Sequence, residues 1–392
     1  MEVPITVVFL NQSYLIQPEI IAALRRLPQL RLVVLDITSH PDGAQAGRAA
    51  EILRAQRCRI LFTVNEWGID TGGIVQAFCE SAGVLHVNWC VDDPFYEAVM
   101  LKRKFRPSSC RIDFVSDRDY LPRMRAQGYN ARFLPLAVDP QMFRPSDGGY
   151  TNDCAFVGNS YLMQIDAFAR GAESLLDSMV PFLAGIMRKY FSDAAVDVAA
   201  AVEEFIATST LPQNLSGEKA AFIAKHFAGY LYRKHIVASL LSEIPGFFVY
   251  GDDGWLQVAA RDRVRKVRYE RALSEVYGAT RVNVDINRVV IRNGFTQRVF
   301  DTLASGAFVI TSAKPVIGEF FETAEGHREI ETFENAEELH DKIRYYLNHE
   351  EKRKAVAERG RARVLGAHTY DHRIGTIFRL LREDFGKGKA SD

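Results

Sequence analysis

The sequence predicts an α/β protein made of two doubly wound, Rossmann-like domains. At 392 residues, the chain is about two to three times the size of a usual domain. Apolar segments of strand length alternate with amphipathic helical segments, which is typical of parallel sheets covered by helices on both faces. The strand segments form two sets, separated by the turn-rich stretch DPQMFRPSDGGYTND at 139–153, which we interpret as the linker.

The first domain is predicted to span residues 1–145. Its expected strands lie at residues 5–10, 31–37, 59–64, 84–89, 112–116 and 132–137. In such sheets ligands bind beyond the carboxyl ends of the strands, which here are residues 11–14, 65–68, 92–93 and 116–117. Two acids at these ends, Glu66 and Asp92, are our catalytic candidates, although either could instead cap the helix that follows it.

The second domain is predicted to span residues 150–368. Its expected strands lie at residues 154–159, 247–251, 281–286, 307–312 and 328–333. Residues 161–241 are almost entirely helical in pattern. A strand-helix-strand crossover needs far fewer residues, so this segment predicts a helical insertion in the second domain. An amphipathic pattern at residues 369–385 predicts a terminal helix.

The segment 292–312 has the pattern of a polar loop, a short helix, a glycine stop and a buried strand. Gly294 frees the backbone, and Thr296 can cap the helix, whose first N–H groups have no internal partner and attract anions such as a diphosphate. Arg298, near the helix start, suits phosphate oxygens, and Asp301, one turn later, suits sugar hydroxyls. The alternative is an Arg298–Asp301 ion pair on a solvated helix face.

Several stretches together resemble the CgeB-like proteins, a family named for a spore maturation protein and grouped with the GT-B glycosyltransferases. They are RNGFTQRVFDTLASGAFVIT, KPVIGEFFE, IRYYLNHEEKRKAVAERG and HTYDHR in the second half, and VNWCVDDPF, FLPLAVDPQMF and CAFVGN before them. The resemblance implies two Rossmann-like domains that face each other across a cleft. It also implies that the second domain holds a nucleotide sugar and that the terminal helix crosses back to the first domain.

The function implied by this resemblance is the transfer of a sugar from a nucleotide-diphosphate sugar to an acceptor hydroxyl, without a metal ion or other cofactor. The acceptor, a glycan, a protein or a small molecule, is left open. Two alternatives are a nucleotide-sugar epimerase and a non-catalytic nucleotide-sugar-binding protein. The insertion at 161–241 could bind the acceptor, a partner or a second copy of the chain to form a homo-oligomer, or it could be a structural elaboration.

Many retaining GT-B enzymes carry two acidic residues separated by seven others, the second of which binds ribose. Asn293 and Asp301 take these places, so the resemblance assigns ribose to Asp301. Asn293 supplies no negative charge, so a retaining mechanism does not carry over. Arg298 is a catalytic candidate because its charge can offset that of the departing diphosphate.

The predicted donor-binding residues share a place at a strand end or near the helix at 297. They are Gly158, Asn159, Ser160, Tyr250, Gly251, Asp252, Arg265, Lys266, Tyr269, Asn293, Gly294, Phe295, Thr296, Gln297, Arg298 and Asp301. Backbone N–H groups at 158–160 could face the diphosphate, and Arg265 and Lys266 are candidates for phosphate contact. The alternative for 250–252 is an ordinary turn, and for the basic run at 261–268 a solvated face.

Composition and cysteine pattern favour a cytoplasmic protein with a small-molecule ligand. Lys plus Arg and Asp plus Glu are equal at 49 each, so no overall charge draws the chain to nucleic acid or to a membrane. The five cysteines are scattered and lack CxxC spacing, which favours buried thiols over disulfides or metal ligands.

His368 and His372 share a helical face but have no acid nearby in the pattern, so no metal site is expected. No segment has the length of a membrane span.

Overall fold

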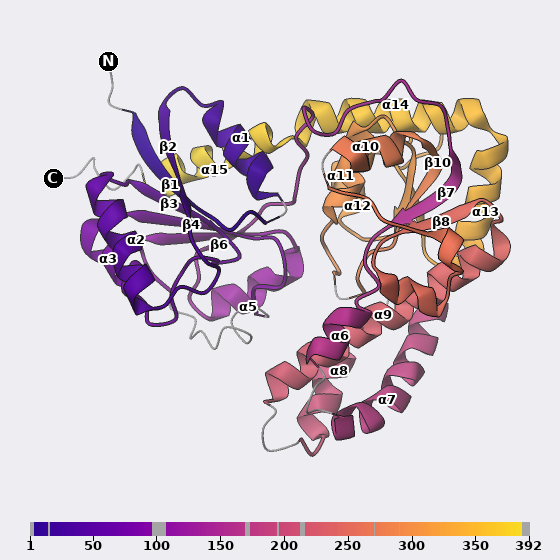
Figure 1. The fold of residues 1–392 in the computed structure, drawn as a ribbon, viewed down its shortest axis with the longest axis horizontal. Coiled ribbons are helices and arrows are strands. Elements are labelled where there is room, and N and C mark those ends of the chain that lie inside the picture. The colour runs from indigo at the N-terminus through magenta and orange to yellow at the C-terminus, as the bar shows by residue number, and fades with distance from the viewer. Residues whose placement is uncertain are drawn as a thin grey trace. The chain divides into compact units, whose positions relative to one another are not determined.

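The computed structural model of the protein describes residues 4–14, 16–95, 107–168, 173–193, 196–211, 216–269, 271–289 and 291–385. The chain divides into two compact units, shown in Figure 1. The first contains Met1–Asp139 together with His368–Asp392, and the second contains Pro140–Ala367. The end of the chain therefore belongs to the same unit as its beginning.

The first unit is built on a six-stranded parallel sheet with the strand order β2-β1-β3-β4-β5-β6. Its strands are β1 (Ile5–Asn11), β2 (Leu30–Asp36), β3 (Ile60–Val64), β4 (Leu85–Cys90), β5 (Arg111–Val115) and β6 (Ala131–Phe133). Its helices include α1 (Gln17–Arg25), α2 (Gly43–Ala55), α3 (Ile74–Ala82), α5 (Leu121–Ala126) and α15 (Tyr370–Phe385). Every residue of β3 and β5 is buried, as expected for strands covered on both faces.

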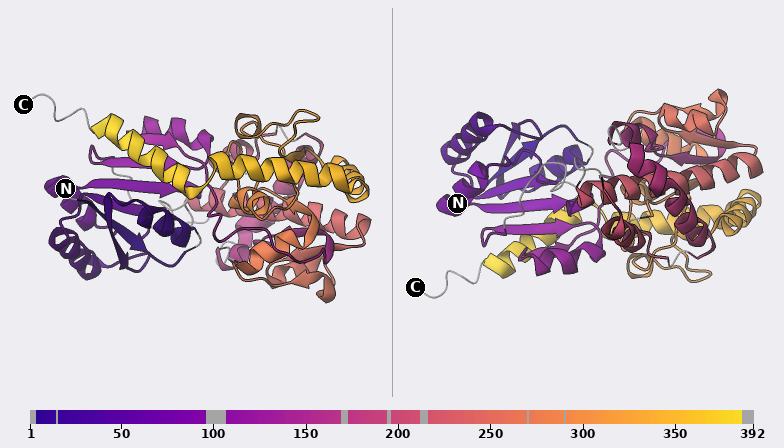
Figure 2. Two further views of the ribbon diagram at one scale, coloured as in Figure 1. Left: turned by 90° about the horizontal axis from the view of Figure 1, so that it is seen from above. Right: turned by 90° about the horizontal axis from the view of Figure 1, so that it is seen from below.

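Helix α15 packs within the first unit, as Figure 2 shows. The ring of Tyr370 meets that of Trp89 edge-on, with the centroids 5.9 Å apart. Arg26 Nε donates to Asp371 Oδ1 at 2.8 Å, and Arg373 Nε donates to the carbonyl oxygen of Pro135 at 2.9 Å. Apolar and polar contacts thus both fix this helix to the first sheet and its neighbours.

The second unit contains another six-stranded parallel sheet, with the strand order β12-β11-β10-β7-β8-β9. Its strands are β7 (Asn152–Val157), β8 (Phe247–Tyr250), β9 (Val264–Arg265), β10 (Thr280–Asp285), β11 (Val309–Ser312) and β12 (Glu331–Phe333). Its helices include α10 (Arg271–Gly278), α11 (Gln297–Ala304), α12 (Ile317–Phe320), α13 (Ala336–Asn348) and α14 (Glu350–Ala367). The two sheets confirm the predicted fold class, whereas the two-residue edge strand β9 was not predicted.

The described residues between β7 and β8 form four helices, which Figure 1 shows gathered on one side of the second unit. They are α6 (Leu162–Phe168), α7 (Glu173–Ser192), α8 (Val198–Thr208) and α9 (Gly217–Glu243). Stacked rings of Phe182 and Phe205, 4.1 Å apart, join α7 to α8. The long helix α9 returns the chain to the sheet and buries residues along most of its length. Within the described residues, no helix combines the length and the apolar character needed to cross a membrane.

Helix α14 packs so closely beside α11 that one of its glycines cannot be replaced without movement. A Cβ atom on Gly360 would lie 2.3 Å from the Glu329 carbonyl oxygen and 2.6 Å from Leu303 Cδ2. We therefore expect Gly360→Ala to lower the free energy of unfolding by about 1–3 kcal/mol. Gly366→Ala on the same helix is the matched control, because its Cβ would meet nothing within 4 Å. Denaturant unfolding measures both, and a Gly360→Ala protein as stable as wild type would contradict this packing.

Candidate functional site

The candidate site lies at the carboxyl ends of β10 and β7 in the second unit, where a buried carboxylate organises the surrounding elements. Asp285, the last residue of β10, is 1% exposed. It accepts hydrogen bonds from Thr296 Oγ1 at 2.9 Å, Arg298 Nε at 2.8 Å and Thr311 Oγ1 at 2.8 Å. One carboxylate thus ties β10 to β11 and to the start of α11. Sequence reasoning missed Asp285, although its place at a strand end was a signal that could have found it.

Helix α11 begins at the predicted place, but its first turn is not capped as predicted. Thr296 occupies the N-cap position with an extended backbone, and its side chain makes no cap hydrogen bond. The prediction of a Thr296 cap is wrong because the hydroxyl donates to the buried carboxylate of Asp285 instead. The helix start therefore presents N–H groups that this side chain does not satisfy, a setting that favours an anion.

Arg298 lies beside this helix start and is directed toward the strand ends. Its side chain is 22% exposed and pairs with Asp285, while Nη2 donates to the Ile286 carbonyl oxygen at 3.3 Å. Burial is the largest single influence on the pKa of Arg298 and lowers it, but the charge and hydrogen bond of Asp285, together with Tyr161 and Tyr277, raise the pKa overall. The alternative of an Arg298–Asp301 ion pair on a solvated face is wrong, because Arg298 pairs across the fold with Asp285.

A second arginine, Arg233 of α9, reaches the same point. It is 1% exposed, and its Nη1 and Nη2 donate to the carbonyl oxygens of Asn159 at 2.8 Å and Ile286 at 3.1 Å. Arg233 and Arg298 thus share one carbonyl oxygen, and both guanidinium groups lie over the Phe156 ring, at 5.5 and 5.7 Å. Among the described residues, Arg233 Nε is buried without a hydrogen-bond partner.

The electrostatic setting of Arg233 is unfavourable for its charge. Burial is the largest cause that lowers its pKa, to about 10, and the neighbouring cations Arg298 and Arg288 lower it further. Sequence reasoning missed Arg233 because it lies in a long helical pattern that carried no functional signal. The available clue was its place on the side of the helix that carries apolar residues, in the stretch GYLYRKHIV.

The loop after β7 packs against the loop after β8. The Ser160 N–H donates to the carboxylate of Asp252 at 3.2 Å, and the Gly158 N–H donates to the Tyr250 carbonyl oxygen at 2.9 Å. A Cβ atom on Gly251 would lie 2.4 Å from the Gly158 carbonyl oxygen, so only glycine fits there. Two N–H groups predicted to face a diphosphate are therefore occupied by protein acceptors. Asn159 in this loop is exposed. Tyr161, also in the loop after β7, has a φ of 72°, which is a strained value for a tyrosine.

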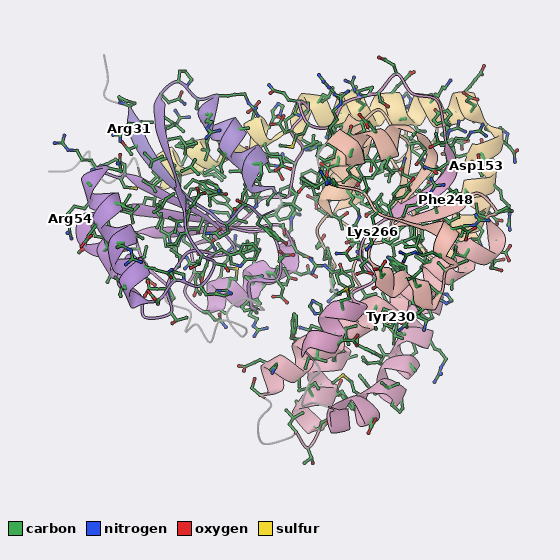
Figure 3. The ribbon with its side chains drawn as sticks, viewed as in Figure 1. Arg31, Arg54, Asp153, Tyr230, Phe248 and Lys266 are labelled. Carbon is green, nitrogen blue, oxygen red and sulfur yellow. The ribbon has the colours of Figure 1, made fainter. Side chains whose placement is uncertain are left out.

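Two other predicted donor residues, Tyr250 and Arg265, are directed away from this site, and a third, Lys266, is engaged in an exposed ion pair. The Tyr250 hydroxyl accepts hydrogen bonds from Asn152 Nδ2 at 3.1 Å and Arg265 Nη1 at 3.0 Å, and Asn152 is the first residue of β7, at the opposite end of that strand. Arg265 also stacks on Phe248, at 3.7 Å. Lys266 Nζ bonds Asp253 on the surface; Figure 3 labels Phe248 and Lys266. We therefore leave Tyr250, Arg265 and Lys266 out of the candidate site.

Asp301 lies on α11, one turn after Gln297, and Gln297 connects it to Tyr269. It is 1% exposed, and Gln297 Nε2 donates to Asp301 Oδ1 at 3.5 Å. The same Nε2 donates to the Tyr269 hydroxyl at 2.5 Å, and the Tyr269 ring meets that of Phe143 edge-on at 5.7 Å. Gln297 and Tyr269 are partly exposed. One amide group of Gln297 therefore joins Asp301 to Tyr269.

The residues before α11 divide between core and surface. Phe295 is buried in an aromatic cluster, with its ring 5.4 Å from Phe300 and 5.3 Å from Phe320. Its side chain is therefore unavailable to a ligand, contrary to prediction. Gly294 is buried and is absent from the described residues with a positive φ, so the predicted need for backbone freedom is not met. Asn293 is partly exposed.

The catalytic candidates of the first unit are both engaged at the carboxyl end of its sheet. Glu66 forms an ion pair with Arg111, which also binds Asp113, and Asp92 Oδ2 accepts a hydrogen bond from Asn65 Nδ2 at 3.0 Å. Asn65 and Glu66 have φ values of 54° and 56°, a strained turn at the end of β3. Helix α3 has Gly73 at its N-cap, so Glu66 does not cap it. The residues that follow Asp92 from 96 to 106 lie outside the described part of the chain.

A family model matches the part of the chain that contains the second unit's site. Residues 233–379 match the family model described as "Glycosyl transferase-like". The match begins at Arg233 and includes Asp285, Arg298 and Asp301, but it covers less than half of the chain. A search of the curated proteins finds no match. The resemblance to the CgeB-like proteins therefore stays a prediction.

Similar solved structures show the fold class. The sucrose-phosphate synthase of Thermosynechococcus elongatus is 11% identical with a TM-score of 0.57, and the match covers 98% of this chain and 100% of that one. HepE of Anabaena in complex with UDP-glucose is 10% identical with a TM-score of 0.58, covering 96% and 99%. A glycosyltransferase of Rickettsia africae is 11% identical with a TM-score of 0.50, covering 99% and 100%. At these identities the likeness establishes the fold, which is that of GT-B glycosyltransferases.

Proposed function

We propose that this protein is a glycosyltransferase that moves a sugar from a nucleotide-diphosphate sugar to an acceptor hydroxyl, and that Arg233 and Arg298 bind the diphosphate. The observation that carries this proposal is the meeting of two guanidinium groups, that of the buried Arg233 and that of the partly exposed Arg298, on the Ile286 carbonyl oxygen beside the start of α11. Asp285 pairs with Arg298. Two cations, Arg298 and Arg288, act against the charge of Arg233, and Tyr161 and Asp285 act in its favour. An anionic ligand would balance this charge.

The geometry suits the chemistry of donor cleavage. When the bond between sugar and diphosphate breaks, negative charge builds on the departing phosphate oxygens. Arginine groups and helix N–H groups that are already oriented stabilise such charge without reorganising. Asp285 acts as a positioning residue because it holds the Arg298 side chain through Nε. This bond does not use the two terminal nitrogens of the guanidinium group. We propose that these cations take the place of a metal ion.

The rest of the donor site follows from α11 and the neighbouring loop. We propose that Asp301 binds the ribose after Gln297 turns away, and that Tyr269 borders the base. Asn159, Asn293 and the first N–H groups of α11 complete the site. A nucleotide-sugar ligand is supported by the family match over residues 233–379 and by HepE, a structural neighbour whose complexes contain UDP, glucose and UDP-glucose.

The acceptor belongs, in this proposal, to the first unit. Glu66 and Asp92 are its candidate acids, and a base there would serve an inverting reaction. Glu66 would need to exchange its ion pair with Arg111 for a substrate hydroxyl. The free cysteines, four of them buried, fit a reducing compartment, so we propose that the protein works in the cytoplasm.

The test incubates the protein with nucleotide-diphosphate sugars and a cell extract that supplies acceptors. Two quantities are measured: the release of nucleoside diphosphate and the transfer of a labelled sugar to a product. Transfer that depends on Arg298 supports the proposal. Inversion of the sugar without an acceptor would instead identify an epimerase. Tight binding of the donor with no turnover would identify a sensor, an outcome that Asn293 in place of the usual acid leaves open.

A further inference from the structure

A cavity at the opposite end of the second sheet is lined by a buried arginine that forms no ion pair with the described residues. The cavity has a volume of about 210 Å³, and Thr280, the first residue of β10, lies in its wall. Its other lining residues include Tyr150, Arg281, Phe308, Arg353 and Lys354. Since Asp285 ends the same strand, this cavity and the candidate site lie at opposite ends of β10.

Arg353, in the first turn of α14, is the central feature of this cavity. It is 2% exposed, its Nη1 donates to the Tyr346 carbonyl oxygen at 2.5 Å, and its guanidinium lies 5.5 Å from the centre of the Tyr150 ring. No carboxylate in the described part of the chain lies within ion-pair distance of it. Glu350, on the same turn, bonds Lys354 Nζ at 2.6 Å instead. A buried charge without a counter-ion is costly, and a bound anion removes that cost.

The remaining groups around the cavity fit an anion as well. Among its lining residues, the cations Arg281, Arg353 and Lys354 outnumber one carboxylate, Glu358. Arg281 pairs with Asp153, which Figure 3 labels, at 3.4 Å, and both side chains of that pair are about half exposed. Exposed pairs of this kind are weak, so Arg281 and Lys354 can turn toward a ligand at little cost. Guanidinium and ammonium groups together favour phosphate oxygens.

We propose that this cavity binds a small oxyanion of the phosphate type, either inorganic phosphate or a phosphomonoester, with Arg353 as its main ligand. The cavity is smaller than the roughly 300–1,000 Å³ typical of pockets for drug-sized ligands, which favours a phosphate group with few attached atoms. The site is separate from the proposed diphosphate site and does not depend on the glycosyltransferase proposal.

The test is thermal unfolding of the full chain in increasing inorganic phosphate, with glycerol 3-phosphate in a parallel series and the ionic strength held constant with chloride. Both ligands are expected to raise the unfolding temperature of wild type in a saturable way. Arg353→Met should lose this response and, without ligand, should unfold at the wild-type temperature or above it, because it removes an unbalanced charge. A stronger response to glycerol 3-phosphate identifies a phosphomonoester site, and an equal response identifies a phosphate site.

Two control variants separate this cavity from other anion sites. Arg344→Met, an exposed arginine on α13 outside the cavity, and Arg298→Met should both keep the response. Arg281→Met and Lys354→Met, which change exposed side chains, should each weaken binding about three- to tenfold and remain informative if Arg353→Met does not fold. The proposal is overturned if wild type shows no saturable response, if the cavity variants respond as wild type does, or if only Arg298→Met loses the response.

Discussion

Arg298→Met is expected to weaken the binding of a nucleoside diphosphate by about 10- to 100-fold. The substitution removes the hydrogen bonds between a charged guanidinium and phosphate oxygens, and each bond of this kind is worth about 1.5–3 kcal/mol. Methionine, like arginine, has an unbranched side chain. Isothermal titration calorimetry first identifies which of UDP, GDP, ADP and dTDP binds wild type most tightly. The same ligand is then titrated into the variant.

The control for Arg298→Met has to account for a loss of stability. The variant leaves Asp285 buried without its cation, so its free energy of unfolding should fall by about 3–5 kcal/mol. Titrations therefore use a temperature at which circular dichroism shows both proteins folded. Arg344→Met, which removes an exposed arginine of the same unit, should bind as wild type does. Equal affinities for the Arg298→Met protein and wild type would rule out the phosphate role of Arg298.

Arg233→Met is expected to change nucleotide binding and stability in opposite directions. Affinity for the nucleoside diphosphate should fall by about tenfold or more, because a buried charge-assisted contact is lost. The free energy of unfolding should stay unchanged or rise by up to about 2 kcal/mol, since the variant removes a desolvated cation whose pKa is already lowered to about 10. Calorimetric titration and denaturant unfolding measure the two quantities on the same preparation.

This combination separates a ligand-binding arginine from a structural one. A purely structural Arg233 would stabilise the loop after β7 through the Asn159 carbonyl oxygen, so its removal would lower stability and leave affinity unchanged. A stable variant with weaker binding is the pattern of a residue retained for function at the expense of stability. The double variant of Arg233 and Arg298 should bind no nucleotide at concentrations that saturate wild type.

The sequence was sufficient to predict the two doubly wound units, because buried parallel strands are continuous apolar runs. The expected strand at 59–64 and the observed β3 differ by one residue, and 281–286 and the observed β10 are similarly close. The exception is β9, whose two residues lie in a basic run and leave no apolar pattern to find. Short edge strands are held by backbone pairing with a neighbour, here β8, and local sequence carries little information on such pairing.

The candidate site was predicted only in part, because its decisive contacts join residues far apart in the chain. Arg298 and the start of α11 were found from a local pattern. The partner of Arg298 is Asp285 rather than Asp301, since the Arg298 side chain turns toward β10. Arg233 comes from a helix more than fifty positions before Asp285 along the chain, and only the fold brings the two near each other. Phe295 was misassigned because a phenylalanine in a polar loop gives no sign of the aromatic cluster that buries it.

The most direct test of the central claim is a crystal structure of the protein with its tightest-binding nucleoside diphosphate. We expect the two phosphates to contact Arg298, Arg233 and the first N–H groups of α11, and Gln297 to have turned so that the ribose reaches Asp301. Phosphates bound elsewhere, with Arg298 still held by Asp285 and Arg233 untouched, would contradict it.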